Sequence, residues 1–218
     1  MIFDWRSALR LGRAKREDLD RLGTASQLAL RLDRQLGNED RACTLFIAGA
    51  DDDMAGAEAC AELALSLADE YGRSVLMVDA TFGAQGIGSM LRDGAGLGLS
   101  ELLDADLVSA ESLAGAVLPT THGLVNCLPA GTRIGGRVAS ASAKRLRGFL
   151  EAAGSGVDFV LVQGANVLAG GRSLAFVALC DANLVVVLEG KTRVERIEMA
   201  RDILLDCGAK RVGLILAE

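Results

Sequence analysis

Short runs of apolar residues recur along the chain and alternate with longer segments of helical periodicity. The apolar runs predict buried strands at 44–50, 74–80, 124–131, 158–164, 183–190 and 212–217. The periodic segments predict helices at 17–36, 56–70, 139–153 and 193–208, with a short helix near Ile87. Strands that are apolar on both faces and separated by helices are typical of a parallel sheet covered on both sides. The sequence therefore predicts a three-layer α/β fold with a mostly parallel central sheet.

The first sixteen residues differ from the rest of the chain in charge. Residues 1–16 carry +4, and since the whole chain carries −6, the other 202 residues carry −10. The same segment is rich in apolar side chains and holds the only tryptophan, Trp5. We expect a basic N-terminal arm (1–16) and a single domain (17–218). The arm is either a frayed terminus or a docking segment for a partner or an anionic membrane surface.

Composition excludes several classes of protein. Half of the residues are hydrophobic and 24% are charged, which is typical of a globular chain. The acidic pI of about 5.0 argues against nucleic-acid binding through bulk charge. The single histidine excludes His-rich metal sites, and five scattered cysteines indicate reduced thiols in a cytoplasmic protein. No apolar run is long enough to span a bilayer.

The segment after the first strand stands where related folds bind phosphate. Function in such sheets lies at the carboxyl ends of the strands. The segment reads Asp51, Asp52, Asp53, Met54, Ala55, Gly56, Ala57, Glu58. It lacks the lysine that contacts phosphate and the hydroxyl that holds Mg²⁺. Three carboxylates here would also repel a triphosphate.

Two interpretations of the acidic segment remain open. Asp51–Asp53 could cap the following helix and interact with its dipole, so that the loop needs no ligand. Alternatively, Asp51–Asp53 and Asp79 could form a divalent-cation site, although consecutive carboxylates do not readily converge on one ion. We favour the first interpretation and expect no metal site.

Several motifs together resemble one protein family. They are VLMVDAT (75–81), GLGLSELLDAD (96–106), LVNCLPAG (124–131), GVDFVLVQGAN (156–166) and the C-terminal segment 180–218. From about Leu28 to Ala217 the chain resembles the cytoplasmic domain of bacterial tyrosine kinases (BY-kinases) and polysaccharide co-polymerases. These domains belong to the ParA/MinD class of deviant P-loop ATPases. The resemblance implies a P-loop NTPase-like fold.

The resemblance also assigns the positions of nucleotide chemistry, and most of them hold other residues here. These are Gly56 for the phosphate lysine, Ala57 for the Mg²⁺-binding hydroxyl, Asp51 for the signature lysine, Thr81 for the second carboxylate of Asp-x-Asp, and Gln163 for the Walker-B-type aspartate. Asp79 alone keeps the residue of the family. We therefore expect no catalytic residues, and absent or weak binding of ATP and Mg²⁺.

The family's Glu-x-x-Arg-x-x-Arg oligomerisation motif is incomplete in this chain. It appears as Leu28, Arg31 and Arg34, so that both arginines are present and the glutamate is not. Arg31, Arg34 and Trp5 are the candidate interface residues. We expect His122 to be a loop residue with no acid nearby, and Ser140 and Ser142 to cap a helix. The turn at Lys191–Arg193 could face a ligand, a partner or solvent.

The resemblance implies a cytoplasmic pseudo-ATPase or pseudokinase without catalytic activity. It would be a scaffold or regulator in bacterial capsule, exopolysaccharide or holdfast-like polysaccharide biosynthesis and export. Its partner would be a membrane polysaccharide co-polymerase or another export component at the inner face of the inner membrane, and the chain could form a homo-oligomer. One alternative is an atypical nucleotide-binding ATPase or protein-tyrosine kinase. Another is a degenerate ParA/MinD-like protein of positioning or pilus assembly.

Overall fold

The strands form one sheet that runs through the middle of the molecule. The computed structural model describes residues 19–36, 41–82, 86–88, 97–104, 108–132 and 142–217. Within them the sheet has seven strands in the order β3-β4-β2-β5-β1-β6-β7. Their bounds are β1 Cys43–Gly49, β2 Val75–Ala80, β3 Leu118–Pro119, β4 Val125–Leu128, β5 Phe159–Gly164, β6 Ala182–Leu188 and β7 Val212–Ala217. Every neighbouring pair is parallel except β3 and β4, which confirms the predicted mostly parallel α/β sheet.

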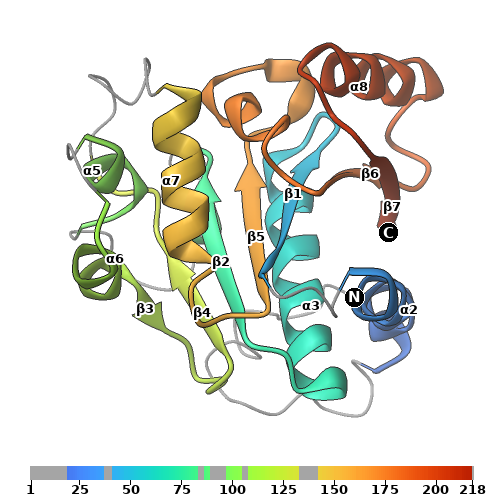
Figure 1. Ribbon diagram of the computed structural model, residues 1–218. Coiled ribbons are helices and arrows are strands. Elements are labelled where there is room, and N and C mark those ends of the chain that lie inside the picture. The colour runs from blue at the N-terminus through green and yellow to red at the C-terminus, as the bar shows by residue number, and fades with distance from the viewer. Residues whose placement is uncertain are drawn as a thin grey trace.

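Helices cover both faces of this sheet, with α7 in front of it and α3 behind it in Figure 1. One face carries α2 (Leu19–Leu36) and α3 (Asp53–Tyr71). The other carries α5 (Leu99–Asp104), α6 (Ala110–Ala116), α7 (Ala143–Ala153) and α8 (Val194–Asp206), with 3₁₀ turns at Val167–Ala169 and Arg172–Phe176. Among the described helices, none combines the length and the apolar character needed to cross a bilayer.

The central strands are buried on both faces, which explains their uninterrupted apolar runs. Every residue of β1, β2 and β5 is buried. Along β1, Leu45 and Ile47 pack into the core on the α3 side, whereas Phe46 and Ala48 pack into the core on the α7 side. Because both faces are covered, no position along these strands favours a polar side chain except at their ends.

Besides the two 3₁₀ turns, the described residues contain three short elements that the periodicity does not predict: α5, α6 and β3. The helix α6 is fixed by a capping box in which Ser109 and Ser112 bond reciprocally. Glu101 in α5 accepts hydrogen bonds from the N–H and Oγ1 of Thr132 at 3.0 and 2.9 Å. Helices of fewer than two turns and strands of two residues are too short to show a hydrophobic period in the sequence. Of the short helix predicted near Ile87, only residues 86–88 are described.

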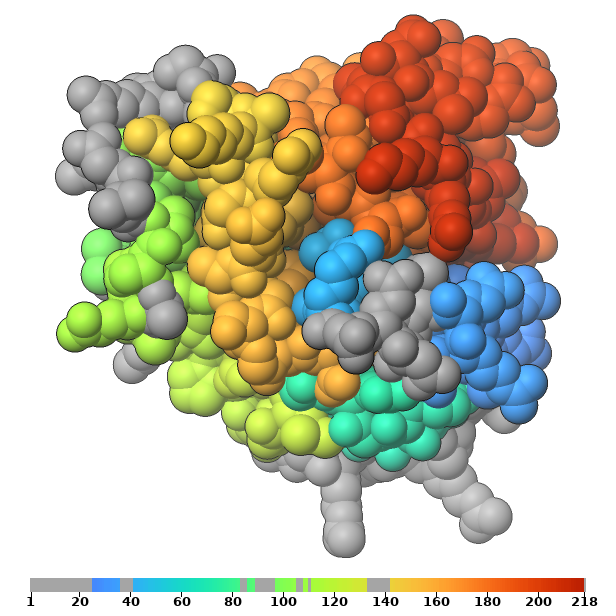
Figure 2. Space-filling view, viewed as in Figure 1, coloured from blue at the N-terminus to red at the C-terminus, as the bar shows by residue number. Residues whose placement is uncertain are grey.

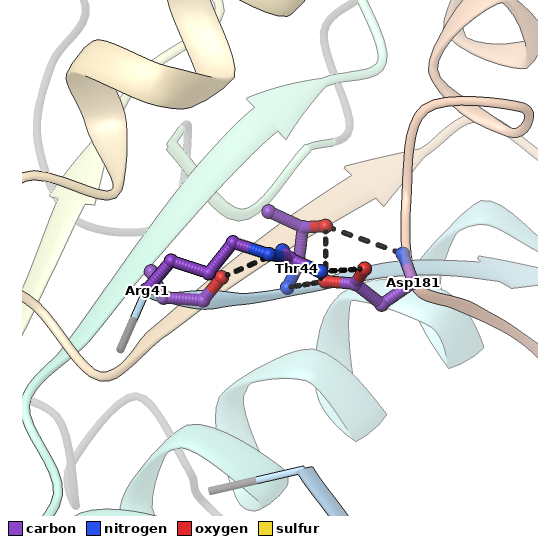
Figure 3. Close-up of polar contacts among 4 residues, drawn as sticks. Arg41, Thr44 and Asp181 are labelled. Carbon is purple, nitrogen blue, oxygen red and sulfur yellow. Dashed lines mark hydrogen bonds and ion pairs between the residues drawn. The ribbon is translucent and has the colours of Figure 1, made fainter. Parts of the chain in front are cut away.

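At the amino ends of the strands, Asp181 ties β6 to β1 (Figure 3). Its carboxylate accepts from the N–H and the Oγ1 of Thr44, both at 2.9 Å, and from the two terminal nitrogens of Arg41 at 3.0 and 2.7 Å. Burial opposes ionisation of this carboxyl, but the hydrogen bonds from Arg41 and Thr44 lower its pKa below the ordinary value. Asp181 is therefore held ionised between two neighbouring strands.

The same arrangement recurs between β2 and β5. Asp158 accepts from the N–H and the Oγ of Ser74, both at 2.7 Å, and the Oγ accepts from the Asp158 N–H at 3.0 Å. Arg73 lies 3.5 Å from Asp158 and also pairs with Asp33 of α2 at 2.6 Å. Two Asp–Ser/Thr–Arg clusters thus fasten the amino edge of the sheet.

We expect Asp181→Asn to destabilise the protein in a pH-dependent way. Because the folded-state pKa of Asp181 is lowered, its stabilisation is present at neutral pH and is lost as the pH falls below about 4. The variant should lower the free energy of unfolding at neutral pH by about 2 kcal/mol, and the difference should shrink in acid. Urea unfolding across pH measures this. Asp202→Asn, which breaks an exposed ion pair with Arg201, is the control and should change little. An equal loss at all pH values would contradict the account.

Candidate functional site

The candidate site lies at the carboxyl ends of β1, β2 and β5, where α3 begins (Figure 1). Only residues 50–52 connect β1 to α3. Phosphate-binding motifs span eight residues that run from the end of the strand into the first turn of the helix. The connection is also tight, since a Cβ at Gly49 would lie 1.8 Å from the Asp52 carbonyl oxygen. The chain thus turns into the helix three residues earlier than the predicted start at 56, and only glycine fits at 49.

Gly56, the position that the resemblance assigns to the phosphate lysine, faces the backbone of β1. A Cβ at this position would lie 2.7 Å from the Gly49 nitrogen and 3.2 Å from Ala48 atoms. No side chain fits there unless the helix moves away from the strand. The next residue, Ala57, is fully buried, whereas Glu58 is only half-buried. The first turns of α3 therefore pack against the sheet.

Asp52 is the N-cap of α3. Its backbone is extended (φ −136°, ψ 122°), and its Oδ1 accepts from the N–H groups of Met54 and Ala55 at 2.8 and 3.0 Å. These are N–H groups that the helix itself leaves without partners, and that bind phosphate in phosphate-binding loops. Here a carboxylate of the chain bonds to them, as the self-capping interpretation predicts.

The other two carboxylates of the segment contact two different elements. Asp53 Oδ1 accepts from the N–H and Nδ2 of Asn166, which follows β5, at 2.5 and 3.1 Å. Asp51 accepts from Thr192 Oγ1 at 3.2 Å and pairs with Arg196 of α8 at 2.8 Å. Within the described residues, no three acidic, His or Cys side chains form a group that could hold a metal ion. A cation site at Asp51–Asp53 would require these contacts to break.

Asp79 is buried at the end of β2, with an exposed fraction of 2%. Its carboxylate accepts from the N–H and Oγ1 of Thr81 at 3.0 and 2.6 Å, and from the Gly88 N–H at 2.9 Å. Burial raises the pKa of Asp79, and the bonds from Thr81 and Gly88 oppose that rise in part. Thr81, which the resemblance places at the second carboxylate of the family, serves here as a hydrogen-bond donor to the first.

Gln163 lies beside Asp79, because β2 and β5 pair in the register Asp79 to Gln163. It is fully buried, and its Oε1 accepts from the Ile87 N–H at 2.8 Å. In the described part of the chain, its Nε2 has no hydrogen-bond partner. A Cβ at Gly86 would lie 2.0 Å from the Asp79 carboxylate. Residues 86–88 therefore close tightly over both polar side chains.

The candidate interface residues are only partly described. Arg31 and Arg34 are exposed on α2, whose Ala29 and Leu32 pack into the core. Leu28, at the position of the family's glutamate, also packs against that core. Trp5 lies outside the described residues. The exposed arginines are available to a partner, and their role at an interface stays a prediction.

The partners of the acidic segment were not predicted from the sequence. Asn166 could have been noticed as a cap, since its Oδ1 accepts from the Ala169 N–H at 2.7 Å. In the turn at Lys191–Arg193, Thr192 contacts Asp51, so this part of the turn faces the acidic segment. A cavity of about 520 Å³ beside this turn is lined by Lys191, Arg193, Glu195 and Arg196. Of the two serines expected to cap α7, Ser142 is its N-cap, and Ser140 lies outside the described residues.

His122 has an acidic partner, so the prediction that no acid lies nearby was wrong. Its Nε2 lies 2.9 Å from Asp69 Oδ1, and its Nδ1 accepts from the Leu124 N–H at 3.3 Å. The two residues are 53 positions apart in sequence, and only the packing of α3 beside β4 brings them together. Because both ring nitrogens have partners, the pair holds the turn between β3 and β4 to the end of α3.

Comparison with known proteins supports the fold. No family model matches the chain, and no curated protein matches it. Among solved structures, it is similar to the kinase domain of the Escherichia coli tyrosine kinase ETK, with 20% identity, a TM-score of 0.75, and coverage of 99% of this chain and 86% of that one. It is also similar to the VpsO kinase domain, with 19% identity, a TM-score of 0.74, and coverage of 94% of this chain and 99% of that one. A third similar structure is a ParA family ATPase from Chlorobium tepidum, with 16% identity, a TM-score of 0.63, and coverage of 80% of this chain and 73% of that one. The chain thus has the P-loop NTPase-like fold of BY-kinase domains and ParA/MinD ATPases.

We expect Asp52→Ala to destabilise α3 and Asp52→Ser to have little effect. Alanine removes the acceptor for the Met54 and Ala55 N–H groups, whereas serine can still cap the helix. The loss should be about 1 kcal/mol in the free energy of unfolding, measured with urea. If both variants were as stable as the wild type, the Asp52 carboxylate would not be the cap that stabilises this helix end.

Proposed function

We propose that this chain is a non-catalytic relative of BY-kinase domains that acts as a scaffold or regulator. The observation that carries the proposal is the closed connection between β1 and α3. Residues 50–52 form a short connection, and Asp52 already accepts hydrogen bonds from the Met54 and Ala55 N–H groups at the start of the helix. A nucleotide would have to displace that carboxylate before its phosphates reached the helix end.

The residues at the nucleotide positions support the same proposal. Gly56 has no room for a side chain against β1, and Ala57 offers no hydroxyl to Mg²⁺. Gln163 stands for the Walker-B-type aspartate and is buried under residues 86–88. Asp79 is then a lone carboxylate with its bonds directed to Thr81 and Gly88. We infer that ATP and Mg²⁺ bind weakly or not at all.

The biological role follows from the resemblance to BY-kinases and polysaccharide co-polymerases. We propose that the chain supports capsule, exopolysaccharide or holdfast-like polysaccharide export in bacteria. Its partner would be the cytoplasmic face of a membrane co-polymerase or of another export component. It would remain in the cytoplasm, at the inner membrane only through that partner or through residues 1–16.

We expect calorimetric titration with Mg·ATP to show no saturable binding at nucleotide concentrations up to about 1 mM. The physical reason is that three carboxylates and a capped helix end oppose a triphosphate. An active P-loop ATPase titrated in parallel shows that the assay detects binding. Saturable binding, or ATP hydrolysis above background, would instead favour the atypical ATPase or kinase.

We expect removal of the gene from the bacterium that carries it to reduce exported polysaccharide, and a plasmid copy to restore it. Surface polysaccharide measured per cell provides the readout. Unchanged polysaccharide would contradict the proposed role even if nucleotide binding were absent. A defect in division or DNA positioning would favour the ParA/MinD-like alternative.

A further inference from the structure

The last strand, β7, forms an open edge of the sheet. In the described strands it pairs only with β6, and it stands at one end of the strand order. The Asn183 N–H donates to the Arg211 carbonyl, and the Glu189 N–H donates to the Ala217 carbonyl. The odd-numbered residues of β7 therefore direct their backbone N–H and C=O groups toward β6. Because backbone groups alternate along a strand, Val212, Leu214 and Leu216 direct theirs to the outer edge. Figure 2 shows this C-terminal region, in red, at the surface of the molecule.

Two leucines of this strand are exposed next to one another. Leu214 and Leu216 have exposed fractions of 57% and 55%, although their partners in register on β6, Val185 and Val187, are buried. Exposed edge strands are normally protected by a charge, a proline or a bulge. The strand Val212–Ala217 has no charged residue and no proline. Such an edge is suited to pairing with another strand.

We propose that β7 pairs antiparallel with β7 of a second copy of this chain, about a twofold axis at Leu214. This register sets Leu214 opposite itself and Val212 opposite Leu216. All of these residues direct their backbone groups outward, so about six hydrogen bonds can form across the axis. Residues that are paired in this way point to the same face of a sheet. The four leucines of two copies therefore form one apolar cluster.

The charges at the two ends of β7 favour a second copy in this orientation. Lys210 and Arg211 precede the strand, whereas the Glu189 N–H donates to the Ala217 carbonyl at its far end. Antiparallel pairing about Leu214 sets the basic end of one copy against the acidic end of the other. Parallel pairing would set like charges together, which is unfavourable. The strand is thus complementary to itself in charge as well as in hydrogen bonding.

The interface is small, and it does not depend on nucleotide chemistry. A contact made by one pair of six-residue strands is expected to be smaller than a standard interface of roughly 1,600 Å². We therefore expect a dimer with a Kd on the order of micromolar. The pairing of β7 uses no residue of the β1–α3 site. A test of the pairing is therefore independent of a test of the proposed scaffold function.

Sedimentation velocity of the full chain tests the proposal. Over a concentration range of about a hundredfold around the micromolar Kd, the wild type should shift from monomer to dimer. Leu214→Pro removes an outward N–H, and Leu214→Arg brings two like charges to the axis. Both should weaken association at least about tenfold. Leu124→Arg changes an exposed leucine beside β4, near the other end of the strand order, and should leave the dimer intact.

A disulfide measures the register directly. Paired residues in this register have Cα atoms about 5.5 Å apart, within the range of a disulfide. In a glutathione redox buffer, Leu214→Cys should give a covalent dimer, whereas Leu124→Cys and the wild type should not. The wild type is the control for the native cysteines, of which four are buried and Cys207 is half-buried.

The outcomes separate the possibilities. A wild type that stays monomeric at all concentrations overturns the second copy as the occupant of this edge. A dimer that survives Leu214→Arg overturns the proposed interface, as does a Leu214→Cys chain that forms no covalent dimer. If Leu214→Pro loses its fold, as judged by circular dichroism, Leu214→Arg decides, because it keeps the backbone N–H and changes only an exposed side chain.

Discussion

The close contact between α3 and β1 is the constraint on which the rest of the site depends. Glycines at 49 and 56 let the helix begin directly after the strand and lie against its backbone. This proximity shortens the connection to residues 50–52 and leaves the helix end facing a carboxylate instead of an open loop. Once the helix stands there, the positions that carry phosphate chemistry in related folds face the sheet or point to neighbouring elements.

Carboxylates form stabilising contacts at both ends of the strands, the carboxyl ends and the amino ends. At the carboxyl edge, Asp51 and Asp53 join the start of α3 to α8 and to the loop after β5. At the amino edge, Asp158 and Asp181 tie neighbouring strands through paired N–H and hydroxyl donors. Each of these carboxylates accepts hydrogen bonds from N–H, hydroxyl or guanidinium donors of the same chain.

How far the sequence predicts the structure depends on the length of each element. Six strands and four helices follow from apolar runs and helical periodicity, because central strands buried on two faces admit few polar residues. Missing from that prediction are α5, α6 and β3, since their formation depends on caps and on pairing with β4. The candidate site follows from the sequence in part, because its residue types mark the segment Asp51–Asp53 and predict a helix cap within it, which the structure places at Asp52.

The sequence by itself determined the fold class and the absence of a lysine or a hydroxyl in the segment after the first strand. Those are properties of residue type and local pattern, which can be seen without coordinates. Only the tertiary structure decided that Asp53 meets Asn166, that Asp51 meets Arg196, and that Gln163 lies under residues 86–88. The physical reason is the parallel sheet, which brings strand ends that are more than a hundred residues apart to one edge.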